Sequence, residues 1–194
     1  MERSSKLNIS PKLLKEVISF KDKVSSKKDN DVTVQIKDAY EMGDPDTVLD
    51  FYFSIVSSQS YGPKMEKFYI DQCGLEKVSS KLDRGDFKTH KDVYGEYKFT
   101  YSPEYKSHSY NFVQIRPWQD IAGYVFEVYS DVDGFRRLNI SKEDMRVILE
   151  KYGQLAHGTK ETNLNEKKEL AIRGKIGDDC WQDMISFHKE DLFS

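Results

Sequence analysis

The first part of the chain carries hydrophobic residues at the spacing of amphipathic helices. A Ser-Pro pair at 10–11 is a typical helix start, and apolar residues at helical spacing predict a helix from there to about residue 24. An Asp-Pro pair at 44–45 predicts a second helix that runs to about residue 57. Residues 60–63 should interrupt the helical pattern, and a third helix around 65–70 should end at Gly74.

The middle of the chain alternates apolar and polar residues with the period of β-strands. Strands are predicted at about 77–87, 92–101, 109–116 and 124–129, because these segments are rich in Tyr, Phe, Val and Thr. The Asp-Val-Asp-Gly sequence at 131–134 predicts a hairpin turn.

Helical and strand patterns return near the C-terminus. Ser141 is a typical N-cap with an acidic residue three positions later, and the helix it begins should end at Gly153. A polar loop should follow over 154–165, then a short strand at 170–173 and a last helix at 180–188.

This order of elements predicts an α/β (α+β) fold in which a central mixed β-sheet is flanked by helices. The 194 residues are enough for one core, so a single domain over 1–194 is expected. Its parts would be a helical part at about 1–75, a sheet at about 76–130, and helices and loops at about 131–194.

Composition indicates a soluble, cytoplasmic protein. Charged residues make up 32% of the chain, and no apolar run is long enough to cross a membrane. A secretory signal segment is not expected, and the two cysteines, Cys73 and Cys180, suit a reducing compartment. The net charge of −3 does not by itself point to nucleic acid, although a local cluster of Lys and Arg could still bind it.

Several catalytic classes lack their motifs in this sequence. The four histidines have no metal-type spacing, which argues against a zinc site. Neither a phosphate-binding GxxxxGK[ST] or GxGxxG loop nor a GxSxG nucleophile motif occurs, so nucleotide-driven and esterase chemistry are not expected.

The strongest chemical signal is an acidic residue followed by a Glu-x-Lys strand. Asp86 precedes a predicted hairpin, and Glu96 and Lys98 follow in the next strand, where alternate side chains share a face. The hairpin would bring the two carboxylates and the ammonium group together. Such a cluster could bind a hard divalent cation beside an attacking water, as phosphodiester hydrolysis requires.

This pattern resembles the PD-(D/E)xK motif of nucleases, which includes many type II restriction endonucleases. Gly85 stands where the family usually has proline. The resemblance implies a restriction-endonuclease-like sheet and a metal-dependent DNA endonuclease that hydrolyses phosphodiester bonds in double-stranded DNA at a short specific site. It also implies a homodimer, and a cognate DNA methyltransferase in the same system that forms no stable complex with the nuclease.

The resemblance assigns roles to individual residues. Asp86, Glu96 and Lys98 would be catalytic, and Asp86, Glu96 and the backbone carbonyl of Tyr97 would hold Mg²⁺, for which Mn²⁺ could substitute. Glu66, in the predicted third helix, is an additional metal-ligand candidate; a solvent-facing glutamate is the equal alternative.

Two segments are candidates for DNA contact. In the strand 109–116, alternation places Phe112, Gln114 and Arg116 on one face and Val113 and Ile115 on the other. Glutamine and arginine can read base edges or bind phosphate, although Arg116 could instead pair with a carboxylate. The loop residues His157, Thr159 and Lys160 could contact the DNA backbone, or could belong to an ordinary surface loop.

Other readings of the same residues stay open at this point. The chain could be a repair or phage nuclease of the same superfamily that recognises DNA structure, or a DNA-binding module without catalysis. Glu96 and Lys98 could also form a weak surface pair, with Asp86 as a turn residue.

Overall fold

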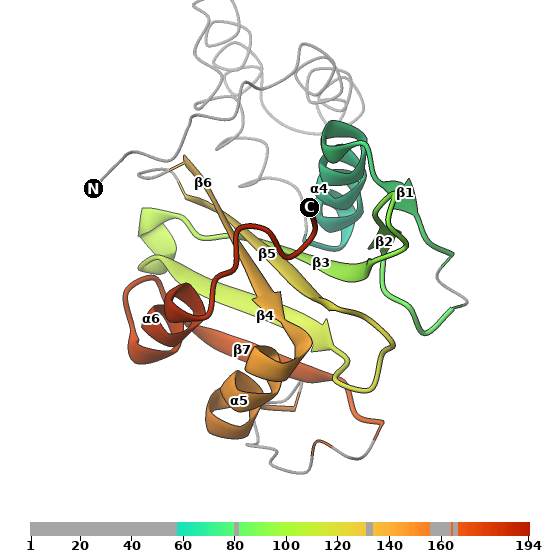
Figure 1. The fold of residues 1–194 in the computed structure, drawn as a ribbon. Coiled ribbons are helices and arrows are strands. Elements are labelled where there is room, and N and C mark those ends of the chain that lie inside the picture. The colour runs from blue at the N-terminus through green and yellow to red at the C-terminus, as the bar shows by residue number, and fades with distance from the viewer. Residues whose placement is uncertain (1–57, 80–81, 131–133, 156–163, 165–166) are drawn as a thin grey trace, which may run out of the picture.

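The computed structural model describes residues 58–79, 82–130, 134–155, 164 and 167–194 (Figure 1). The helices predicted at 11–24 and 45–57 lie outside the described residues, as do His157, Thr159 and Lys160. The prediction of one domain over the whole chain therefore stays a prediction.

Two β-sheets form the centre of the described part. The larger sheet is mixed and five-stranded, in the order β1 (Glu76–Lys77), β2 (Phe87–Lys88), β3 (Tyr94–Tyr101), β5 (Gly123–Ser130) and β6 (Gly134–Ser141). Neighbouring strands of this sheet are antiparallel, except that β3 and β5 are parallel. The smaller sheet pairs β4 (Ser109–Ile115) with β7 (Leu170–Lys175). The predicted α+β class with a mixed sheet flanked by helices is confirmed.

The chain leaves the large sheet between its two parallel strands. Parallel neighbours need a crossover, because the chain must return to the same end of the sheet before the second strand begins. Here the crossover contains a 3-10 turn (Glu104–Lys106) and β4, which pairs with β7 on one side of the large sheet (Figure 1). This topology sets β4 across from β3.

Three α-helices are described, α4 (Ser58–Cys73), α5 (Lys142–Tyr152) and α6 (Asp179–Ser186). Gly74, at φ +63°, ends α4, and the Leu75 N–H donates to the Ile70 carbonyl at 3.0 Å, as in a Schellman motif. Ser141 caps α5 as predicted, because its hydroxyl accepts from the Asp144 N–H at 3.2 Å. None of the described helices is long and apolar enough to cross a membrane.

The predicted interruption at 60–63 is wrong. Helix α4 begins at Ser58 and continues through Pro63. Pro63 lies close to the start of α4, where the first N–H groups have no intrahelical partner. The helix therefore loses only the one hydrogen bond that an N–H at residue 63 would make.

Hydrophobic cores cover both faces of the large sheet. One core joins α4 to β2, β3 and β5, through Tyr61, Met65, Tyr69, Ile70, Phe87, Tyr97, Tyr101, Val125 and Tyr129. The other joins β5 and β6 to the small sheet, α5 and α6, and its largest side chain is Trp181. Every residue of β5 is buried, as expected for a strand covered on both faces.

Two strand predictions need correction. The segment 77–87 forms no continuous strand; only its ends pair, as β1 and β2. In β4, Gln114 has a left-handed φ of +55° and the pairing register shifts between Phe112 and Ile115. This irregularity breaks the alternation, so Phe112 and Ile115 are both buried while Val113 is exposed.

Candidate active site

The β2–β3 hairpin brings Asp86 beside the Glu-x-Lys strand. The Asp86 N–H donates to the Gly95 carbonyl at 2.9 Å, which continues the ladder by one residue. The Asp86 carboxylate then accepts the Tyr97 N–H through Oδ2, also at 2.9 Å. A side chain thus replaces the strand partner that Tyr97 would otherwise have, and this fixes Asp86 directly before the start of β2.

Gly85 explains why this chain lacks the proline of the motif. Its φ is +77°, a conformation that proline cannot adopt because its ring holds φ near −65°. A Cβ atom at Gly85 would also overlap the Gly95 carbonyl. Glycine therefore lets this segment approach β3 closely enough for Asp86 to bond Tyr97.

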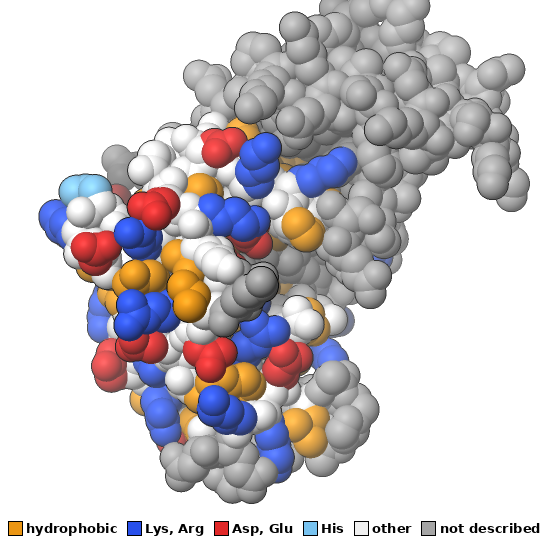
Figure 2. All heavy atoms as spheres, turned by 90° about the vertical axis from the view of Figure 1, so that its right-hand side faces the viewer, with side chains coloured by type: hydrophobic (Ala, Val, Ile, Leu, Met, Phe, Trp, Pro, Cys, Tyr) orange, Lys and Arg blue, Asp and Glu red, His pale blue; other side chains and the backbone are white. Residues whose placement is uncertain are grey.

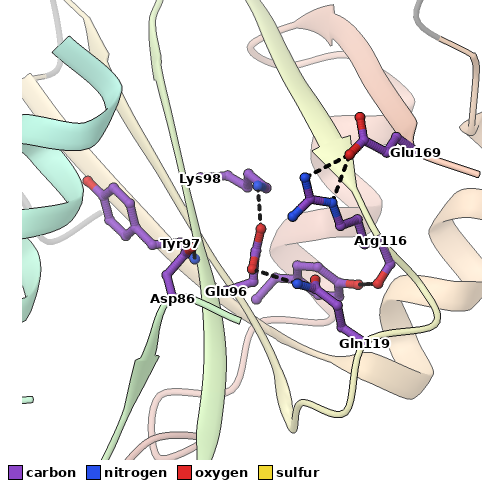
Figure 3. A network of polar contacts seen from close by, with 8 residues as sticks. Asp86, Glu96, Tyr97, Lys98, Arg116, Gln119 and Glu169 are labelled. Atoms are coloured by element: carbon purple, nitrogen blue, oxygen red, sulfur yellow. Dashed lines mark hydrogen bonds and ion pairs between the residues drawn. The ribbon is translucent and has the colours of Figure 1, made fainter. Parts of the chain in front are cut away.

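Glu96 and Lys98 project from the same face of β3, as predicted. Glu96 is only 2% exposed, and Lys98 Nζ lies 2.5 Å from its Oε1 atom. Its other oxygen, Oε2, accepts from Gln119 Nε2 at 3.2 Å (Figure 3). Glu96 is buried and the Lys98 side chain is only 14% exposed, so the pair is not the exposed surface pair of the alternative interpretation.

Gln119 belongs to this site but was not predicted. It is 3% exposed, and its carbonyl oxygen Oε1 is buried without a hydrogen-bond partner among the described residues. Lys142 Nζ donates to its backbone carbonyl, which ties the loop after β4 to the start of α5. Gln119 therefore orients Glu96 while one of its own polar atoms stays unsatisfied.

The two acids lie close enough to affect each other. The pKa of Asp86 is raised from 3.8 to about 7, mainly by burial, then by the negative charge of Glu96 and to a smaller extent by that of Glu66. Lys98 and the Tyr97 N–H lower this pKa but do not compensate. An acid whose charge is disfavoured in this way, in a cavity, is typical of functional sites.

The free edge of β3 supplies a further oxygen. The Tyr97 N–H points away from β5, toward the edge of β3 that the β2 pairing at Tyr94 and Gly95 leaves uncovered. Because the N–H and C=O of one strand residue point to the same side, the Tyr97 carbonyl faces this edge too. Asp86 and the Tyr97 carbonyl thus share one edge of the strand.

These groups line one cavity of about 600 Å³. Residues 97–101 of β3 lie along it, with Glu66 of α4 on one side and Gln114 and Arg116 on the other. The cavity therefore joins the catalytic, metal-binding and strand-borne DNA-binding candidates that the structure describes. Glu66 forms an ion pair with Lys77 at 3.1 Å. Its negative charge also contributes to the raised pKa of Asp86.

Gln114 and Arg116 do not share a sheet with Glu96 and Lys98. They belong to the β4 segment of the small sheet and reach the cavity from across it. Arg116 donates to Glu169 Oε1 from Nε at 2.9 Å and from a terminal nitrogen at 2.7 Å (Figure 3). Burial lowers the pKa of Arg116, but Glu169, Glu96 and Asp86 raise it overall, so the guanidinium stays charged.

The donor set suits a hard cation that keeps part of its water shell. No cluster of three or more His, Cys, Asp or Glu side chains with metal-binding geometry occurs within the described ranges. Asp86 and Glu96 offer two carboxylates, however, and Tyr97 offers a carbonyl. Mg²⁺ is commonly held by one or two carboxylates together with waters and substrate phosphate, so these residues fit it.

Charges of both signs are mixed on the face that carries β1 and β2. Figure 2 shows Lys and Arg side chains interspersed with Asp and Glu there. Lys88 pairs with both Glu76 and Asp92 at 3.2 Å, which is one example. Among the described residues, this face therefore carries no evenly basic surface.

A scan against protein-family models found no match to the chain, and a search of curated proteins found no significant match. The resemblance to PD-(D/E)xK nucleases therefore rests on the motif residues and on their geometry.

Proposed function

We propose that this protein is a Mg²⁺-dependent DNA endonuclease that hydrolyses phosphodiester bonds in double-stranded DNA, similar to type II restriction enzymes. The observation that carries the proposal is the convergence of Asp86, Glu96 and Lys98 in one cavity, with the pKa of Asp86 raised to about 7. The order in which these residues follow one another in the hairpin resembles the PD-(D/E)xK motif, which supports a restriction-endonuclease-like sheet.

In this proposal Asp86, Glu96 and the Tyr97 carbonyl hold the cation, and Glu66 is close enough to act through its charge. When bound, the cation lowers the pKa of a coordinated water and polarises the scissile phosphate. Gln119 keeps Glu96 Oε2 in place through its amide, so the carboxylate is oriented before any ligand arrives.

Lys98 contributes a positive charge at the point where negative charge develops on the phosphate. It is held by Glu96 at 2.5 Å and its side chain is only 14% exposed, so it is preorganised. A fixed charge in a water-poor site stabilises a transition state more than a mobile charge in solvent. Arg116, across the cavity, can exchange Glu169 for a phosphate or a base edge.

The buried acids favour catalysis over simple DNA binding. A module that only binds DNA gains nothing from two carboxylates in the cavity that meets the substrate, because they repel phosphate. A bound cation removes this repulsion and uses both carboxylates as ligands. Sequence-specific cleavage and a homodimer follow from the family resemblance, since two-fold symmetric enzymes match palindromic sites.

Incubation of the protein with a panel of plasmids, in Mg²⁺ or Mn²⁺ and in parallel with EDTA, tests the proposal. Discrete bands that require the metal are expected. Metal-dependent nicks or smears would keep the nuclease but replace site specificity with recognition of DNA structure. Intact DNA under all metal conditions, with the protein folded, would refute the proposed function.

A further inference from the structure

A second buried glutamate lies on the opposite face of the large sheet. Glu127 of β5 is 1% exposed and stands beside Phe99 of β3, on the side that α4 covers. Its Oε1 atom accepts from Arg137 at 2.9 Å and 2.7 Å, and its Oε2 atom accepts from the Tyr97 hydroxyl at 2.5 Å. Both oxygens of this buried carboxylate are thus hydrogen-bonded.

The Tyr97 ring is held from several sides. It stacks on Tyr69 of α4, with ring centroids 5.0 Å apart and planes at 19°. Arg137 lies over the same Tyr69 ring at 4.6 Å, so the guanidinium links the glutamate to the aromatic pair. Burial and the charge of Glu127 raise the pKa of Tyr97, which keeps its hydroxyl protonated and able to donate.

The backbone of this same tyrosine serves the candidate active site. Its N–H donates to Asp86 Oδ2 at 2.9 Å, and its carbonyl faces the free edge of β3. Figure 3 shows the ring pointing away from Glu96 while the amide meets Asp86. The ring and these peptide groups share the Tyr97 Cα atom, so a ring anchored at its hydroxyl and stacked on Tyr69 limits displacement of the backbone that positions Asp86 and the carbonyl.

We propose that Glu127 and Arg137 are positioning residues that clamp the Tyr97 side chain and so fix two of the three metal-binding oxygens, those of Asp86 and the Tyr97 carbonyl. This inference rests on the proposed function and adds a supporting layer from the far face of the sheet. Groups that orient metal ligands commonly change metal affinity or activity about 10- to 100-fold when they are altered.

A purely structural role is the competing explanation. A buried ion pair can stabilise a fold or merely be tolerated in it, without any effect on a nearby site. Under that explanation, loss of the Tyr97 hydroxyl lowers stability only. Metal affinity, measured on folded protein, separates the two explanations, because a structural role leaves it unchanged.

The test measures Mn²⁺ binding to wild type and to Tyr97→Phe at a temperature where both proteins are folded. Electron paramagnetic resonance reports the concentration of free Mn²⁺ and so gives the dissociation constant. Tyr97→Phe keeps the ring and loses only its bond to Glu127. We expect its dissociation constant for Mn²⁺ to rise about 10- to 100-fold. Arg137→Lys, which loses the paired contact, is expected to weaken binding in the same direction.

Tyr152→Phe is the matched control. Its hydroxyl also donates to a carboxylate, Asp183 at 2.8 Å, but it lies on α5 and does not line the cavity. Wild-type Mn²⁺ affinity in Tyr97→Phe and Arg137→Lys would overturn the positioning role while leaving the metal site intact. Failure of the wild type itself to bind Mn²⁺ or cleave DNA would instead refute the proposed function, and the inference with it.

Discussion

Glu96 and Glu127 are two almost fully buried carboxylates on neighbouring strands of one sheet, facing opposite sides. Glu127 has a guanidinium and a phenol as donors, and its side of the sheet is packed with aromatic rings from α4. Glu96 has one ammonium group and one amide, and a second acid, Asp86, raises the negative charge around it.

The two carboxylates differ in the hydrogen-bond donors and the charges that surround them. A buried carboxylate with matched donors on both oxygens can be kept for structure. On the other face, Asp86 and Glu96 line one cavity with Lys98 as the neighbouring cation, and the pKa of Asp86 is raised. This is the arrangement expected where a cation or an anionic transition state is bound. The predictions below test whether the two faces differ in this way.

The largest effect is expected from Asp86→Asn. The asparagine keeps an oxygen that can accept the Tyr97 N–H, but it removes the charge that would hold the cation. Single-turnover cleavage should fall by about 10³-fold or more, because several kcal/mol of charge stabilisation are lost. A rate near that of wild type in Mg²⁺ would show that Asp86 is no ligand.

On the other face, Arg137→Met should cost stability. It leaves Glu127 buried without its cation, and breaking a buried pair by removing one partner costs about 3–5 kcal/mol. Arg137 is partly exposed, so we expect the lower end of that range in urea unfolding. Lys88→Met, which breaks exposed pairs on β2, is the control and should change stability by about 0–1 kcal/mol.

Lys98→Met tests the single cation of the candidate active site. Loss of a preorganised charge of this kind typically costs about 10²- to 10³-fold in rate. Single-turnover cleavage with saturating Mg²⁺ and protein, at a temperature where the variant is folded, measures it. An unchanged rate would mean that the Glu96–Lys98 pair is a structural contact without a role in the reaction.

A smaller effect concerns the pH dependence of stability in EDTA. The pKa of Asp86 is raised from 3.8 to about 7 in the folded protein, so the folded state binds more protons than the unfolded state between these values. This contribution to stability is complete below about pH 4 and is lost as pH rises through about 7.

Asp86→Asn should therefore be more stable than wild type at pH 8, by on the order of 1–3 kcal/mol, and should show a flatter profile between pH 4 and 8. Urea unfolding at several pH values checks this. Equal slopes in the two proteins would contradict the raised pKa. Addition of Mg²⁺ at pH 8 should stabilise wild type and have little effect on the variant.

Local signals in the sequence predicted much of the fold. The Ser141 cap and the Gly74 helix end each depend on neighbouring residues, and the structure has both. The strands on either side of the predicted hairpin turn pair as β5 and β6, while residues 131–133 of the turn itself lie outside the described residues. The Asp86, Glu96 and Lys98 cluster was also predictable, because one hairpin holds it together. Glu127 and Arg137 could have been found as well, since the hairpin sets them directly opposite each other.

Long-range features were not predictable in this way. Gln119 meets Glu96 only because the crossover returns the chain to the site after β4, and no local pattern encodes that path. The pairing of β4 with β7 in a second sheet likewise depends on contacts between segments far apart in the sequence. At Gln114, the pairing with β7 imposes a left-handed residue that propensity alone disfavours, so the predicted faces of this strand were wrong.

The most direct test of the central claim compares Glu96→Gln with Glu127→Gln, two equal changes on opposite faces of one sheet. Single-turnover DNA cleavage is measured with saturating Mg²⁺ for each folded variant. The account predicts a loss of about 10³-fold or more for Glu96→Gln, and a rate within about tenfold of wild type for Glu127→Gln, whose defect lies in metal affinity and stability. Glu96→Gln with a wild-type rate would contradict the assignment of the active site.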